Sequence, residues 1–96
     1  MADWRSSAHL ARHFRDHHRR LGVRSVAAYD ASARETIEVG TYFEYRDLDS
    51  GDARVGYYDG EKQRFTALTD DGETILTHYR CSESYVANSL IGSTYA

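Results

Sequence analysis

The sequence predicts an α+β fold in which two N-terminal helices pack on a four-stranded antiparallel meander sheet, followed by a short C-terminal helix. Two observations carry this prediction. Apolar residues recur at helical spacing as far as Gly40, and beyond it the period falls to about two, which is typical of strands. The 96 residues are 41% hydrophobic, enough for one core, so we expect a single domain over residues 1–96.

Residues 4–21 are expected to form the first helix. At about 100° per residue, Leu10, Phe14 and Leu21 fall on one apolar stripe. Gly22 follows this stripe, and glycine readily adopts the left-handed conformation that ends many helices. The helix should therefore stop at Gly22, with its stripe facing another layer of the fold.

A second helix is predicted over residues 26–39. Ser25 is a suitable N-cap, and Tyr29 and Ala33 repeat at helical spacing within the segment. Because the connection from Gly22 is so short, the two helices should form a hairpin or a bent pair.

Four strand-like runs follow, rich in tyrosine and β-branched residues and separated by aspartate–glycine turns. They cover residues 42–46, 54–59, 64–69 and 74–80. Strict alternation along the last run would place Ile75, Thr77 and Tyr79 on one face and Leu76 and His78 on the other. A short helix over residues 82–90 and a loose end at 91–96 complete the prediction.

The net charge of −3 hides an asymmetry along the chain. Residues 1–24 contain six arginines and two aspartates, whereas residues 25–96 contain six basic and thirteen acidic side chains. The N-terminal segment is therefore either a basic patch that attracts phosphate or a solvated helix face. The longest apolar run is only a few residues, so we expect no transmembrane helix, no signal peptide and a cytoplasmic location.

Four of the five histidines lie in the first predicted helix. The i, i+4, i+8 spacing of His9, His13 and His17 would let neighbouring imidazoles share a metal ion, but the three positions drift around the helix, so we predict no metal site. His18 should pack in the core near Phe14. His17, at the border of the apolar stripe, is either a functional imidazole beside the sheet or an ordinary surface histidine.

The strands offer a second group of polar side chains. Thr77 and His78 lie in a run with apolar neighbours on both faces, which indicates either a site on the sheet or side chains bonded to the backbone. A base-stacking or partner-binding surface is also suggested by Arg54, Tyr57, Tyr58 and Tyr79. Glycine-rich phosphate loops and dinucleotide fingerprints are absent from the sequence, so we expect no cofactor.

Over about residues 9–80, the chain resembles the small ribonuclease toxin domains of the barnase–EndoU–colicin–RelE grouping. The closest versions lie at the C-terminal ends of bacterial polymorphic and contact-dependent-inhibition toxins. The resemblance rests on short stretches in chain order, which are Phe14-Arg15-Asp16-His17, Leu21-Gly22, Tyr29 with Ala33, Val55-Gly56-Tyr57-Tyr58-Asp59, Arg64-Phe65-Thr66, Asp71-Gly72 and Ile75-Leu76-Thr77-His78-Tyr79.

The resemblance implies an endoribonuclease that cleaves RNA without a metal, through attack of a ribose 2′-hydroxyl on the adjacent phosphate. It implies His17 as the acid/base, Arg54 as the phosphate stabiliser, and Thr77 and Tyr79 as orienting hydroxyls. The residues expected to bind RNA are Arg15, Arg19, Arg20 and Tyr58. The implied partners are RNA, with tRNA as one candidate, and a neutralising immunity or antitoxin protein, but neither DNA nor a membrane.

A different class of function fits the same scaffold. The arginine-rich helix and the tyrosine-rich sheet would then dock an acidic protein without catalysis. The two hypotheses differ in geometry. An enzyme requires that His17, Arg54 and Thr77 converge on one surface, whereas an interaction module does not.

Overall fold

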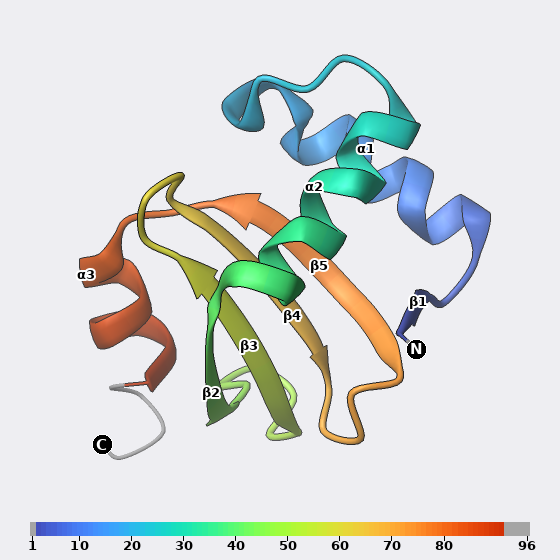
Figure 1. Cartoon of the computed structure of the whole chain (residues 1–96). Helices are drawn as coiled ribbons and strands as arrows, with labels where there is room; N and C mark the ends of the chain where they lie inside the picture. The colour runs from blue at the N-terminus through green and yellow to red at the C-terminus, as the bar shows by residue number, and fades with distance from the viewer. Residues whose placement is uncertain (1, 92–96) are drawn as a thin grey trace.

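The computed structural model describes residues 2–91, and it has the predicted α+β class (Figure 1). The elements in chain order are β1 (Asp3–Trp4), α1 (Ser7–Leu21), α2 (Val26–Val39), β2 (Thr41–Arg46), β3 (Ala53–Asp59), β4 (Arg64–Thr69), β5 (Thr74–Arg80), α3 (Glu83–Tyr85) and the π-helical segment η1 (Val86–Ile91). Apart from Ile91, the expected loose end at 91–96 lies outside the described residues. None of the helices within residues 2–91 is long and apolar enough to span a membrane.

The sheet has five strands in mixed orientation, in the order β1-β5-β4-β3-β2, so the prediction of four antiparallel strands was wrong. Strands β2 to β5 form the expected meander. The additional strand β1 pairs in parallel with β5, placing Asp3 opposite Thr74 and Trp4 opposite Ile75. A two-residue strand shows no alternation of its own, and its pairing depends on how the chain folds back.

Both predicted helix boundaries near residues 22–25 are confirmed. Gly22 ends α1 in the left-handed region with φ 74°. The Ser25 side chain accepts a hydrogen bond from the backbone N–H of Ala28 and caps α2. The start of α1 is later than predicted, because Ser6 is its N-cap and accepts from the N–H of His9. A serine at that position satisfies one of the free N–H groups of the first turn.

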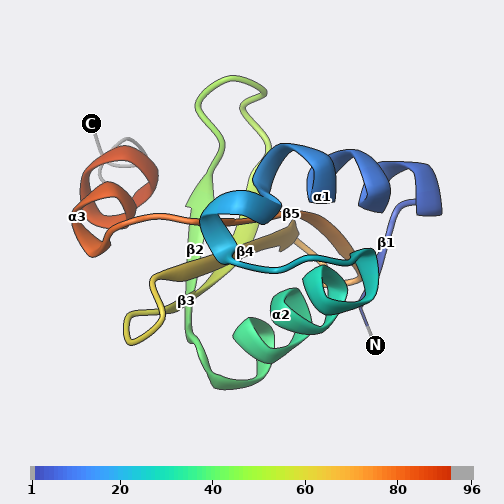
Figure 2. The ribbon, with the colours of Figure 1, turned by 90° about the horizontal axis from the view of Figure 1, so that it is seen from above.

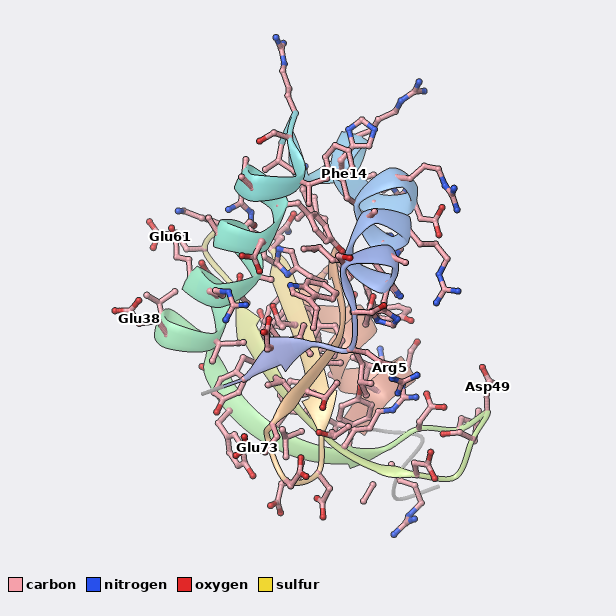
Figure 3. The ribbon with its side chains drawn as sticks, turned by 90° about the vertical axis from the view of Figure 1, so that its right-hand side faces the viewer. Arg5, Phe14, Glu38, Asp49, Glu61 and Glu73 are labelled. Atoms are coloured by element: carbon pink, nitrogen blue, oxygen red, sulfur yellow. The ribbon has the colours of Figure 1, made fainter. Side chains whose placement is uncertain are left out.

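Helix α2 covers one face of the sheet, which we call the first face, and α1 lies along the β5 edge (Figure 2). Phe14 lies between the two helices (Figure 3), its ring 6.0 Å from that of Tyr29. The buried core on this side consists of Trp4, Leu21, Tyr29, Ala33, Val55, Leu68 and Ile75.

The opposite, second face carries a smaller core under the C-terminal helical segment, formed by Tyr45, Tyr58, Phe65, Ala67 and Val86. The β2–β3 hairpin rises on this side of the sheet, with α1 towards one end and α3 towards the other (Figure 2). The second face is therefore framed by elements from both ends of the chain.

A β-bulge in β5 overturns the predicted alternation of that strand. Ile75 pairs with Leu68 and Thr77 pairs with Ala67, so Leu76 is an extra residue with no partner on β4. As a result Ile75 lies in the core of the first face, while Leu76 and Tyr79 pack against the core of the second face. The prediction that Ile75 and Tyr79 share a face was therefore wrong.

His78 is a buried structural residue of the first face. It is fully buried, its Nδ1 donates to the Phe65 carbonyl at 2.9 Å, and its Nε2 accepts from the Ser32 hydroxyl at 2.7 Å. Both ring nitrogens are thus satisfied by the neutral imidazole. Burial lowers the pKa of His78 to about 4, so it is uncharged at neutral pH.

Candidate functional site

Three histidines of α1 form a row that faces β5, and we refer to His9, His13 and His17 as the histidine row. Their neighbouring ring centroids are 4.4 Å and 5.8 Å apart, and all three side chains are half-buried. The row is held against the strand because Leu10 and Phe14, on the next stripe of the helix, pack against the first core. The helix therefore presents imidazoles along the edge of the sheet.

The first two members of the row make hydrogen bonds to β5. His9 Nε2 donates to the Leu76 carbonyl at 2.9 Å. His13 Nδ1 lies 3.1 Å from Oγ1 of Thr77, and because a hydroxyl can donate or accept, this bond fits either neutral tautomer. The resemblance grouped Thr77 with His17, but the structure places Thr77 in contact with His13.

His17 faces Tyr79, with ring centroids 5.5 Å apart. From His13 to His17 the helix rises about 6 Å, which is close to the length of two residues of a strand. Because His13 lies beside Thr77, His17 therefore lies beside Tyr79, two residues further along β5. The Tyr79 side chain is hydrogen-bonded to that of Tyr85, and its pKa is raised, chiefly by burial. Tyr85 itself is 41% exposed, at the border of the second face.

Arg54 lies on the second face but does not reach the histidine row. Its guanidinium pairs with Asp47 at 3.3 Å and hydrogen-bonds to Tyr45, and its Nε is buried without a hydrogen-bond partner among the described residues. Tyr45 lies close enough to Tyr79 to contribute to the raised pKa of the Tyr79 hydroxyl. The predicted convergence of Arg54 with His17 and Thr77 is therefore absent from the contacts of residues 2–91.

The environment of the row favours the neutral form of two of its imidazoles, His13 and His17. Burial lowers the pKa of His13 to about 4, and nearby His9, His17 and Arg12 contribute in the same direction. Burial also lowers the pKa of His17, which the Asp16 carboxylate partly opposes. Neutral imidazoles at pH 7 are able to accept a proton, which general-base catalysis requires.

A stripe of arginines runs along α1 beside the histidine row. Arg5 precedes the helix, and Arg12, Arg15 and Arg19 continue at helical spacing, all of them exposed. We call these four residues the arginine stripe, and blue-tipped side chains project from this outer side of α1 in Figure 3. A shallow pocket of about 640 Å³ is lined by Arg5, Arg12, Arg15 and His9, among other residues. Positive charge thus borders the row directly.

The remaining predicted RNA-binding residues differ in exposure. Arg20 is exposed near the C-terminal end of α1. Tyr58 is only 8% exposed and donates its hydroxyl to the Cys81 carbonyl at 2.9 Å, so its ring has no free face for stacking on a base. Tyr58 is part of the buried core of the second face, which also contains Val86 of the C-terminal helical segment.

A hydrogen bond of the histidine row occupies one of its potential metal-ligating nitrogens. Because His9 Nε2 donates to a carbonyl, that nitrogen carries its proton and has no lone pair for a metal. Within residues 2–91, no three histidine, cysteine, aspartate or glutamate side chains are arranged to hold a metal ion.

Comparison of the chain with protein-family models, with curated proteins and with solved structures found no match.

Sequence reasoning missed the contacts that His13 and Tyr85 make. The sequence indicates His13 only as one of three possible metal ligands, although its four-residue spacing from His17 places both imidazoles near one edge of the helix. Tyr85 gave no signal in the sequence, since its contact with Tyr79 depends on how the segment after β5 folds back.

Proposed function

We propose that the protein is a ribonuclease that cleaves RNA by attack of a ribose 2′-hydroxyl on the adjacent phosphate, without a metal. One observation carries the proposal. Two neutral imidazoles, His13 and His17, lie one helical turn apart beside the hydroxyl-bearing strand β5, and the arginine stripe borders them. Acid–base chemistry and phosphate attraction are thus available at one surface.

In this proposal His17 is the general base and His13 the general acid. His17 takes the proton of the 2′-hydroxyl, and the oxygen forms a bond to phosphorus. The bond from phosphorus to the 5′-oxygen breaks, and that oxygen receives a proton from His13. The products are a 2′,3′-cyclic phosphate and a 5′-hydroxyl.

The acid needs a proton that the free protein does not hold at neutral pH. A bound phosphate within about 4–6 Å favours the protonated imidazole and would raise the pKa of His13 from its low value. Thr77 then fixes the ring of His13 by accepting from Nδ1. Binding of the negatively charged substrate thus favours the protonated form of His13 that the acid requires.

The remaining groups bind the strand. The arginine stripe contacts phosphates on either side of the cleaved bond, and the exposed ring of Tyr85 stacks on a base. Arg54 lies beyond Tyr45 and so contacts the RNA away from the reacting phosphate. An acidic immunity or antitoxin protein that covers the stripe and the row would neutralise such an enzyme in the cytoplasm.

The test is incubation of the purified protein with tRNA and rRNA in excess EDTA, alongside the variants His13→Ala and His17→Ala. His18→Gln is the matched control on the same helix, because His18 stacks on Phe14 and donates to the Val23 carbonyl, away from β5. We expect discrete fragments with 2′,3′-cyclic ends from the wild type and the control. Each row variant should be slower by about 100-fold or more.

Intact RNA with a wild-type protein shown to be folded by circular dichroism would refute the proposal. Equal cleavage by the wild type and both row variants would refute it as well. The first result would favour the non-catalytic interaction module and direct the search to an acidic protein partner.

A further inference from the structure

A second basic pocket lies beyond the end of the histidine row. It has a volume of about 270 Å³, and its lining residues are Arg20, Gln63, Arg80, Cys81 and Ser82. These residues come from the end of α1, the β3–β4 turn and the end of β5 with the cap of α3. We infer that this pocket binds a phosphate group of the RNA, adjacent in the strand to the phosphate at which cleavage occurs. This inference rests on the proposed function.

The charge of the pocket favours an anion. Arg20 and Arg80 supply two guanidinium groups, and none of the five lining residues is acidic. Burial raises the pKa of the Cys81 thiol to about 11, so the thiol adds no negative charge at neutral pH. Guanidinium groups match the geometry of phosphate oxygens and can donate two parallel hydrogen bonds to them.

The walls of the pocket are fixed by bonds between segments distant in the chain. Arg80 Nη2 donates to Gln63 Oε1 at 3.0 Å, and the Cys81 N–H donates to the Gln63 carbonyl at 3.1 Å. Gln63 has a φ of 57°, in the left-handed region that non-glycine residues seldom adopt. Since an arginine has five N–H donors, the bond to Gln63 orients Arg80 and leaves the others for a ligand.

The position of the pocket links it to the reaction proposed above. Arg20 is three residues after His17 and so its neighbour on the surface of α1. Arg80 directly follows Tyr79, whose ring lies beside His17. The pocket therefore adjoins the proposed base, while the arginine stripe borders the row along α1.

The first arm of the test uses inorganic phosphate and no RNA. Phosphate is titrated into the wild-type protein while amide resonances are followed by NMR. We expect saturable shifts at Gln63, Cys81 and Ser82 that disappear in the double variant Arg20→Ala, Arg80→Ala. They should persist in the control Arg24→Ala, which removes an exposed arginine of the α1–α2 connection. Shifts that do not saturate, or that survive in the double variant, would overturn the inference.

The second arm measures cleavage of a short RNA. The double variant should raise KM about 10-fold or more with little change in kcat, because it loses charge-assisted bonds to a phosphate that does not react. An unchanged KM would overturn the pocket inference and leave the proposed function intact. Saturable phosphate binding by a protein that cleaves no RNA would refute the proposed function and the RNA source of the phosphate, while showing that the pocket binds the free anion.

Discussion

The buried imidazole of His78 predicts a specific dependence of stability on pH. Its pKa in the folded protein is about 4, against an ordinary value of 6.5. Between these values the unfolded chain holds a proton at this residue and the folded protein does not. The free energy of unfolding therefore has its full His78 contribution above pH 6.5 and loses it as the pH falls towards 4.

The size of the effect follows from the difference in pKa. Each pKa unit corresponds to about 1.4 kcal/mol, so the whole transition amounts to about 3 kcal/mol. Lowering the pH from 7 to 5 covers about 2 kcal/mol of it. His13 shifts in the same direction but is half-exposed, so solvent screening reduces its share. The carboxyl groups with lowered pKa values, such as Asp47, lose their contribution mainly below this window.

The assay is urea denaturation at pH 7 and pH 5, for the wild type and for His78→Asn. The asparagine amide can still donate to the Phe65 carbonyl but cannot take up a proton. We expect the variant to be less stable at pH 7 and to lose about 2 kcal/mol less than the wild type on acidification. If the variant does not fold, the ring of His78 can be titrated by NMR in the wild type. Equal losses in the two proteins, or a ring that titrates near pH 6.5, would refute the reasoning.

Three further predictions concern packing and the proposed reaction. Gly56→Ala should lower the free energy of unfolding by about 1–3 kcal/mol in urea titration, because its Cβ would lie 2.7 Å from the rings of Phe43 and Phe65. Gly60→Ala, with its nearest contact at 3.7 Å, is the control and should differ little. Thr77→Val should slow RNA cleavage about 10-fold, since His13 loses its orienting bond, and an unchanged rate would contradict that role. Both limbs of the pH profile of kcat/KM for RNA should lie below pH 6.5, because the pKa values of His13 and His17 in the free protein are both lowered, and a limb at higher pH would exclude them as the acid–base pair.

The sequence predicted the elements whose signals are local. The stripe through Leu10 and Phe14, the N-cap at Ser25 and the glycine at position 22 are all set by short-range geometry, and α1 and α2 end or begin where these residues indicate. Strand β1 was not predicted, because a segment of two residues has no alternation pattern and is a strand only through its pairing with β5.

The candidate site was less predictable because it depends on register between elements. Tyr79 and His17 were both predicted, and they are in contact. The pairing of Thr77 with His13 instead depends on how far α1 slides along β5 and on the bulge at Leu76, and neither quantity can be read from alternation.

The docking of α1 has a consequence for the behaviour of the protein at high concentration. Only two residues of β1 pair with the outer side of β5, so the rest of that strand would be an open edge if the helix were absent. Open edges recruit strands from other molecules, and a polar helix laid over one prevents this. Here His9 occupies the Leu76 carbonyl that such a strand would use. Substitutions that detach α1 from β5 should therefore cause self-association and also displace the histidine row from the strand. The solubility of the protein is in this way coupled to the integrity of the candidate site.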